Sequence, residues 1–146
     1  MNILFVCTGN TCRSAMAAAM MNKIAVENDL DIRIESAGVF AEIGQKASEN
    51  AIKALEKYDI NLKEHLTKPV TDELIEKSDI ILTMTEGHKM LLSSMAKDKV
   101  YTLLEFSGSS GDISDPYGGD LEEYEDCARE IYDALVDAAE KIADKN

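Results

Sequence analysis

The sequence has few cysteines, few basic side chains and no long apolar run. Its 3 cysteines in 146 residues are an odd and sparse set, which argues against a disulfide framework and for a reducing compartment. The longest uninterrupted apolar run covers residues 15–21, far short of the ~20 residues that a membrane span needs. The first basic residue is Arg13, so the N-terminus lacks the charged region of a signal peptide. We therefore expect a cytoplasmic protein that makes no use of a membrane.

Acidic residues dominate the charge of the chain. The 15 lysines and arginines stand against 28 aspartates and glutamates, for a formal net charge of −13 at pH 7. Nucleic-acid backbones are bound by basic surfaces, so we expect no nucleic-acid partner. Hydrophobic residues make up 45% of the chain, enough to close a core without metal or disulfide. With no repeat, low-complexity tract or linker, the length suits one domain over residues 1–146, which we expect to be a monomer.

Apolar strands alternate with amphipathic helices along the chain. The run Ile3–Cys7 is continuously apolar, as is typical of a central strand buried on both faces of a parallel sheet. The pattern predicts further strands at 31–35, 80–82 and 100–104, and helices at 14–27, 46–57, 72–77, through 90–95 and from 121 to 142. This order predicts an α/β fold, a doubly wound parallel four-stranded sheet with helices on both faces. Ligands of such sheets bind at the carboxyl ends of the strands, where Cys7 lies.

A short glycine-containing segment joins the first strand to the first helix. Such a loop at a helix N-terminus points successive backbone N–H groups at one spot, where the helix dipole also favours negative charge. The guanidinium of Arg13 adds a planar fork that can hold two phosphoryl oxygens at once. The residues expected to surround a bound phosphate are Thr8, Gly9, Asn10, Thr11, Cys12, Arg13 and Ser14. The segment therefore predicts a binding site for a tetrahedral anion.

Cys7 lies at the floor of this predicted site. The N–H donors and the guanidinium favour the thiolate form of Cys7, which is the nucleophilic form. A thiolate under a bound phosphoryl group is suited to attack on phosphorus. A plainer interpretation is that Cys7 is a buried strand-end cysteine and Arg13 a surface residue. That interpretation explains neither the glycine in the segment nor the position of the segment between a strand and a helix.

The chain resembles the low-molecular-weight protein-tyrosine phosphatase family. That family carries Cys-x5-Arg-Ser/Thr near the N-terminus and an Asp-Pro pair near the C-terminus; here these are Cys7 to Ser14 and Asp115-Pro116, the latter in a loop over residues 107–120. The similarity continues through Ser36-Ala37-Gly38 and residues 78–84, so it covers essentially the whole chain. Ala15 departs from the pattern, since many members have proline there. The resemblance implies the flavodoxin-like form of the doubly wound fold.

The resemblance also implies a mechanism. Cys7 attacks phosphorus and forms a cysteinyl-phosphate, while Arg13 and the loop amides hold the equatorial oxygens. Asp115 donates a proton to the leaving group and then activates water. Asn10 and Ser14 are expected to support the loop, together with Ser36 by analogy with the family. No metal or cofactor is expected, because the thiolate serves as the nucleophile and the guanidinium binds the phosphoryl oxygens.

Thr11 is a candidate determinant of which phosphorylated side chain the enzyme accepts. Tyrosine-specific relatives tend to carry a bulkier apolar residue there, and the whole segment looks like that of the bacterial protein-arginine phosphatases. A hydroxyl leaves room and a polar contact for a guanidinium, whereas an aliphatic chain would leave its N–H groups unpaired. Phe40 and Tyr117 are candidate walls of the pocket. The favoured partners are therefore proteins phosphorylated on arginine, with phosphotyrosine as the alternative.

Other classes of function remain open from the sequence. Arsenate reductases need further cysteines on a mobile segment, and residues 83–95 contain none. A redox sensor would use Cys7 and Cys12, which lie close enough in sequence for a disulfide. We expect such oxidation to protect or regulate the enzyme rather than to be a separate function. A phosphate-binding module without turnover would have no use for Asp115. His65 and His88 lie far apart in sequence and are expected to be structural or surface residues rather than ligands.

Overall fold

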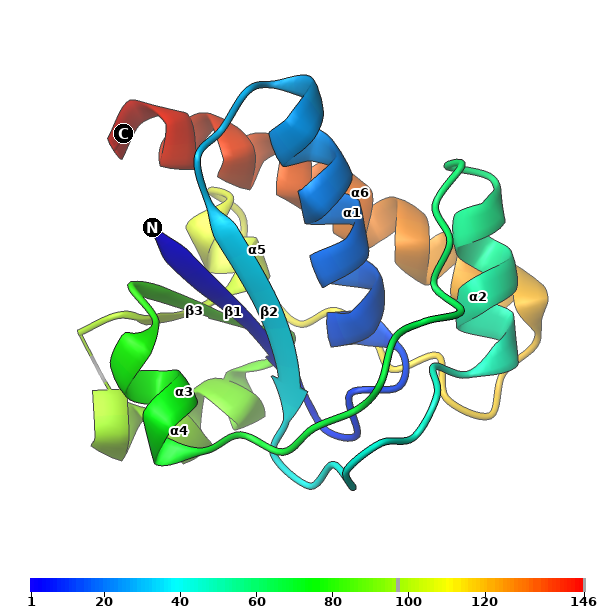
Figure 1. Ribbon diagram of the computed structural model, residues 1–146, viewed down its shortest axis with the longest axis horizontal. Coiled ribbons are helices and arrows are strands. Elements are labelled where there is room, and N and C mark those ends of the chain that lie inside the picture. Colours follow the sequence, from blue (N-terminus) through cyan, green and yellow to red (C-terminus); the bar gives the residue numbers. More distant parts are fainter. Residues whose placement is uncertain (97, 146) are drawn as a thin grey trace.

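The computed structural model describes residues 1–96 and 98–145. Its centre is a parallel four-stranded sheet in the order β2-β1-β3-β4 (Figure 1). The strands are β1 (Asn2–Cys7), β2 (Arg33–Gly38), β3 (Ile80–Thr83) and β4 (Val100–Thr102). Cys7 pairs with Gly38, and Val6 pairs with Thr83. The carboxyl ends of the three longer strands therefore meet at one edge of the sheet, as predicted.

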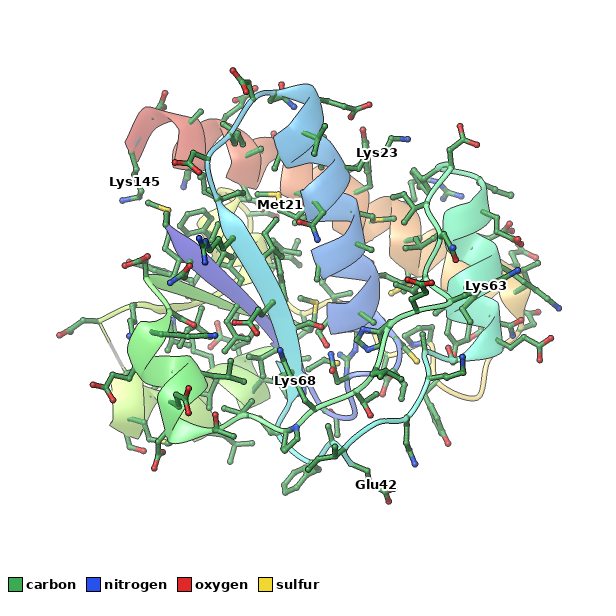
Figure 2. All side chains as sticks on the ribbon, in the orientation of Figure 1. Met21, Lys23, Glu42, Lys63, Lys68 and Lys145 are labelled. Carbon is green, nitrogen blue, oxygen red and sulfur yellow. The ribbon has the colours of Figure 1, made fainter. Side chains whose placement is uncertain are left out.

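Helices cover both faces of the sheet, which confirms the doubly wound fold. They are α1 (Arg13–Glu27), α2 (Glu49–Glu56), α3 (Asp72–Lys77), α4 (Glu86–Ala96), α5 (Leu103–Phe106) and α6 (Leu121–Lys145). Alternate side chains of β1 supply the two cores: Ile3 and Phe5 pack with α1 and α6, whereas Leu4 and Val6 pack with α3 and α4. Met21 of α1, labelled in Figure 2, is fully buried in the first of these cores.

Two predicted strands have wrong bounds, each for a local reason. The alternation at 31–35 predicted β2 too early, because pairing begins at Arg33 opposite Asn2 and runs on to Gly38. The strand predicted at 100–104 ends at Thr102, since the Thr102 hydroxyl and the Glu105 carboxylate form a capping box that starts α5. Helix α2 begins later than predicted, after the N-cap Ser48. The helix predicted at 72–77 is correct, and Thr71 caps it.

Within the described residues, none of the helices combines the length and the apolar character that crossing a bilayer would require.

Candidate active site

Cys7 ends β1 and is buried, and its Sγ lies 2.8 Å from Ser14 Oγ on the first turn of α1. Asn10 Nδ2 donates to Ser14 Oγ at 2.8 Å and to Ser36 Oγ at 3.0 Å. The single hydroxyl hydrogen of Ser14 has two acceptors within reach, Cys7 Sγ at 2.8 Å and the Ala37 carbonyl at 3.4 Å, and the sulfur is the nearer of the two. A hydroxyl that donates to sulfur stabilises the thiolate.

Asn10 holds the loop of residues 8–12, which we call the cradle loop, in its shape. Its backbone has φ 60°, in the left-handed region that asparagine tolerates better than most residues. The backbone N–H of Lys68 donates to Asn10 Oδ1 at 3.1 Å, and this bond fixes which end of the amide is oxygen. Lys68, labelled in Figure 2, thus reaches the loop from a distant segment through its main chain. With both amide hydrogens and the oxygen bonded, the Asn10 side chain has one orientation.

The cradle loop turns its carbonyl groups away from the pocket. Carbonyl oxygens on both sides of Gly9 accept hydrogen bonds from outside the loop. The pairs are Val39 N to Cys7 O at 2.9 Å, Phe40 N to Thr8 O at 2.9 Å, His65 Nε2 to Asn10 O at 2.7 Å and Ser48 N to Thr11 O at 2.9 Å. In a trans peptide the C=O of one residue and the N–H of the next point in opposite directions. The N–H groups of Gly9, Thr11 and Cys12 therefore face the pocket, and among the described residues they have no protein acceptor.

Gly38 of β2 lies directly behind this loop. A Cβ at Gly38 would come within 2.4 Å of Thr8 O and 2.9 Å of Asn10 N. Only glycine allows the loop backbone to approach the strand so closely. Gly9, by contrast, has space on its pocket side, where an added Cβ would meet only Thr11 Oγ1, at 3.7 Å.

Both histidines contact the cradle loop, where neither was predicted to lie. His65 donates to Asn10 O, and His88 Nε2 lies 2.9 Å from Thr8 Oγ1. Of the two positions expected for the histidines, structural or surface, His88 takes the structural one, since it is 6% exposed. Burial lowers the pKa of His65. Burial and then the positive charge of Arg13 lower the pKa of His88 to about 4. Lowered pKa values keep both rings neutral at pH 7.

Arg13 connects the cradle loop to the loop of residues 107–120, which we call the Asp115 loop. The guanidinium is buried, donates from Nη1 to Ile113 O at 2.9 Å and places Nη2 3.5 Å from Asp115 Oδ2. Ile113 N in turn donates to Met84 O, just beyond β3, at 2.9 Å. The Asp115 side chain is half exposed, and its Oδ1 accepts from Tyr117 N at 3.0 Å.

These groups enclose a pocket of about 210 Å³ at the carboxyl edge of the sheet. It is lined by Cys7, Thr8, Gly9, Thr11, Cys12, Arg13, Asp115 and Tyr117. Asn10 belongs to the loop, and its side chain joins Ser14 and Ser36 in the network that supports it. Phe40 does not line the pocket; the residue is 76% exposed, and its backbone N–H donates to Thr8 O. The structure therefore brings together all the sequence-predicted site residues except Phe40.

The other two cysteines are free and buried. Cys12 Sγ lies 3.4 Å from the hydroxyl of Tyr124 on α6, whose pKa is raised to about 12 by burial and by this contact. Cys127 of α6 directs its thiol at Ser114 O at 3.7 Å, and burial raises its pKa to about 12. Cys127 is thus a protonated thiol that packs beneath the Asp115 loop.

An anion-binding loop with a cysteine at its floor, a buried arginine and a carboxylate opposite is the arrangement of phosphatases that use a cysteine nucleophile. A model of the low molecular weight phosphotyrosine protein phosphatase family matches residues 2–146, and the chain belongs to that family.

Relatives in this family carry two kinds of name. The chain is 42% identical over 146 residues to a protein-arginine-phosphatase of Bacillus subtilis (strain 168), with 97% of each chain covered. It is 40% identical over 139 residues to the low molecular weight protein-tyrosine-phosphatase PtpB of Staphylococcus epidermidis, covering 94% of this chain and 95% of the relative. Among solved structures, a cysteine-to-serine variant of YwlE arginine phosphatase with a phosphorylated active-site serine has a TM-score of 0.94 at 41% identity, over 98% of this chain and 96% of that one.

Proposed function

We propose that this protein hydrolyses phosphoarginine in proteins through a cysteinyl-phosphate intermediate. One observation carries the proposal: Cys7, Arg13, Asp115 and Thr11 line the same 210 Å³ pocket. The similarity over the full chain to protein-arginine-phosphatases of Bacillus subtilis and Geobacillus stearothermophilus supports it. The alternative substrate is phosphotyrosine, after which the family and the staphylococcal relatives are named.

In the first step Cys7 Sγ attacks phosphorus, and the bond from phosphorus to the leaving nitrogen breaks. The N–H groups of the cradle loop and the guanidinium of Arg13 hold the three equatorial oxygens, where negative charge is spread in the transition state. These donors are fixed before substrate arrives, because the carbonyl groups and the Asn10 side chain are already bonded. Little reorganisation is then needed during the reaction.

Asp115 supplies the proton that the departing guanidinium nitrogen needs. Its carboxyl group lines the pocket opposite Cys7 and is half exposed, so it can reach both substrate and water. In the second step the same group accepts a proton from water as the water oxygen attacks phosphorus and the S–P bond breaks. Inorganic phosphate leaves and Cys7 is again a thiolate.

Thr11 is the proposed determinant of the leaving group. Thr11 lines the pocket, and within the described residues the one hydrogen-bond contact of its Oγ1 is a long one, 3.5 Å to Cys12 Sγ. The hydroxyl is therefore free to accept a hydrogen bond from a guanidinium N–H. An aliphatic residue there would offer no acceptor and would favour an aromatic ring instead.

The test compares phosphoarginine and phosphotyrosine peptides of the same sequence as substrates for the native protein, Thr11→Ile and Thr11→Ser. We expect the native protein and Thr11→Ser to prefer phosphoarginine, and Thr11→Ile to lose that preference by about tenfold or more in the ratio of kcat/KM values. A native preference for phosphotyrosine would select the alternative substrate. An unchanged ratio of kcat/KM values in Thr11→Ile would show that Thr11 does not determine the substrate preference.

We further propose that the protein works as a cytoplasmic monomer without metal or cofactor. Full activity in a chelator, and an enzyme that sediments as a monomer, are the expected results. The rival functions are distinguishable by their chemistry. An arsenate reductase needs a relay of accessible thiols, whereas Cys127 is buried and has its pKa raised to about 12. A redox sensor would tolerate loss of Asp115, as would a binding module.

A further inference from the structure

Thr8, a residue of the pocket wall, forms a polar pair with His88. Thr8 lines the pocket, and its Oγ1 lies 2.9 Å from His88 Nε2. His88 lies on the first turn of α4, where its backbone N–H donates to Thr85 Oγ1 at 3.1 Å. The ring is thus fixed at one end by the helix and at the other by the cradle loop.

The tautomer of His88 follows from its second nitrogen. His88 Nδ1 is buried and has no hydrogen-bond partner in the described part of the chain. A buried N–H without an acceptor is rarer and more costly than a buried lone pair without a donor. The neutral ring, favoured because burial and Arg13 lower its pKa, therefore carries its hydrogen on Nε2. Nε2 donates, and Thr8 Oγ1 accepts.

The direction of this bond leaves the Thr8 hydroxyl hydrogen unused. Thr8 Oγ1 has no other partner among the described residues. The remaining pocket donors, the loop N–H groups and Arg13, make an anionic oxygen the preferred acceptor at this place. We propose that Thr8 donates its hydroxyl hydrogen to an oxygen of the bound phosphoryl group, and that His88 is the positioning residue that fixes this direction. The inference rests on the proposed phosphatase function but not on which leaving group the enzyme prefers.

The first experiment measures binding of inorganic phosphate to the full chain by calorimetry. Thr8→Val, which keeps the shape and removes the hydroxyl, is expected to weaken phosphate binding about tenfold or more, as for a hydrogen bond to a charged group. Thr8→Ser restores most of the affinity. His88→Leu is expected to weaken binding by a similar factor, and His88→Gln, whose Nε2 lies at the same place along the side chain and can donate, to recover most of it.

The double variant Thr8→Val/His88→Leu separates positioning from a general structural role. If His88 acts through Thr8, the double variant binds phosphate no more weakly than the weaker single variant. Unchanged affinity in Thr8→Val, or losses that simply multiply in the double variant, would overturn the proposal. Thermal unfolding of each variant shows whether it is folded. If His88→Leu does not fold, Thr8→Val and Thr8→Ser alone test whether the Thr8 hydroxyl binds phosphate.

The second experiment reads the tautomer directly. Long-range proton–nitrogen NMR spectra of the native protein at pH 7 are expected to show a protonated Nε2 and an unprotonated Nδ1 on His88. The opposite tautomer would refute the inference, because Thr8 would then donate to His88. Both experiments use inorganic phosphate or no ligand, so failure to hydrolyse phosphoarginine leaves their outcome unaffected.

Discussion

The two loops that form the pocket are built differently. The cradle loop is closed in by a buried network: Asn10 is bonded through every polar atom of its side chain, and neighbouring carbonyl groups are bonded to segments far away in sequence. The Asp115 loop is exposed along most of its length, and within it only Ile113 and Pro116 are buried. Its main anchor is Ile113, whose backbone groups join Met84 O and Arg13.

The difference matches the two tasks that we propose for the site. Holding a phosphoryl group through its transition state requires donors that are fixed in advance. Transferring a proton first to the leaving group and then from water requires a carboxyl group that both can reach. Arg13 couples the two loops, since it lines the pocket beside the cradle loop and its guanidinium contacts Ile113 and Asp115 of the Asp115 loop.

Replacing Cys7 by serine is expected to have the largest effect. The hydroxyl of serine is not ionised in this site, so hydrolysis should fall by ~10⁴-fold or more. Single-turnover and steady-state rates with phosphoarginine peptide check this, with inorganic phosphate binding as the control for an intact cradle loop. A fully active Cys7→Ser variant would mean that the cradle loop binds phosphate but does not supply the nucleophile.

Asp115→Asn tests the other loop. The amide keeps the size of the side chain but cannot donate a proton to the leaving nitrogen or accept one from water, so kcat is expected to fall by ~10²–10⁴-fold. Inorganic phosphate should still bind, because the cradle loop supplies its donors. Unchanged turnover would contradict the division of tasks between the two loops.

The pH dependence of stability tests the buried network around the cradle loop. The pKa of His88 is lowered from 6.5 to about 4 in the folded protein, so the stability that its neutral ring contributes is complete above pH 6.5 and lost as the pH falls toward 4. Between pH 7.5 and pH 4.5, this histidine alone is expected to cost roughly 2–3 kcal/mol of unfolding free energy.

Urea unfolding of the native protein and of His88→Gln at both pH values measures this contribution. The variant should lose correspondingly less stability on acidification. His65, whose pKa is also lowered, contributes in the same direction in both proteins and cancels. Equal losses in the two proteins would show that His88 becomes charged without cost.

Two glycines, Gly38 behind the cradle loop and Gly118 within the Asp115 loop, are expected to give the smallest effects. Gly38→Ala would press a Cβ against Thr8 O and should cost about 1–3 kcal/mol and weaken phosphate binding. Gly118→Ala in the Asp115 loop meets nothing within 4 Å but has φ +83°, so it should cost about 1 kcal/mol of backbone strain with phosphate binding retained. Denaturation and calorimetry check the pair, and equal effects on phosphate binding would contradict the distinction.

Local signals explain which parts of the molecule the sequence predicted. The first strand, the cradle loop and the start of α1 follow one another in the chain, so their residues reveal a strand, an anion-binding turn and a helix directly. The short helix after Thr71 was predicted for the same reason. The end of β2 depends on pairing with β1 instead, and alternation within residues 31–35 carries no information about a partner strand.

The partners of the site residues were hidden because they come from distant segments or from the main chain. Ile113 O and Lys68 N are backbone atoms that any residue type could supply. His88 is 80 residues from Thr8. One signal could have indicated it: the strand at 80–82 was predicted parallel to the first strand, so the residues just after both strands were expected at the same edge. Phe40 shows the reverse, since an aromatic residue near the loop in sequence points into solvent.

The inward-facing N–H groups of the cradle loop have a practical consequence for chemical labelling. Iodoacetate carries a carboxylate that these groups attract toward Cys7, whereas the uncharged iodoacetamide gains nothing from them. Cys127 offers no competition, since its thiol remains protonated at a pKa of about 12. We therefore expect a negatively charged alkylating reagent to be directed to the pocket that Cys7 and Cys12 line, and inorganic phosphate to protect that pocket.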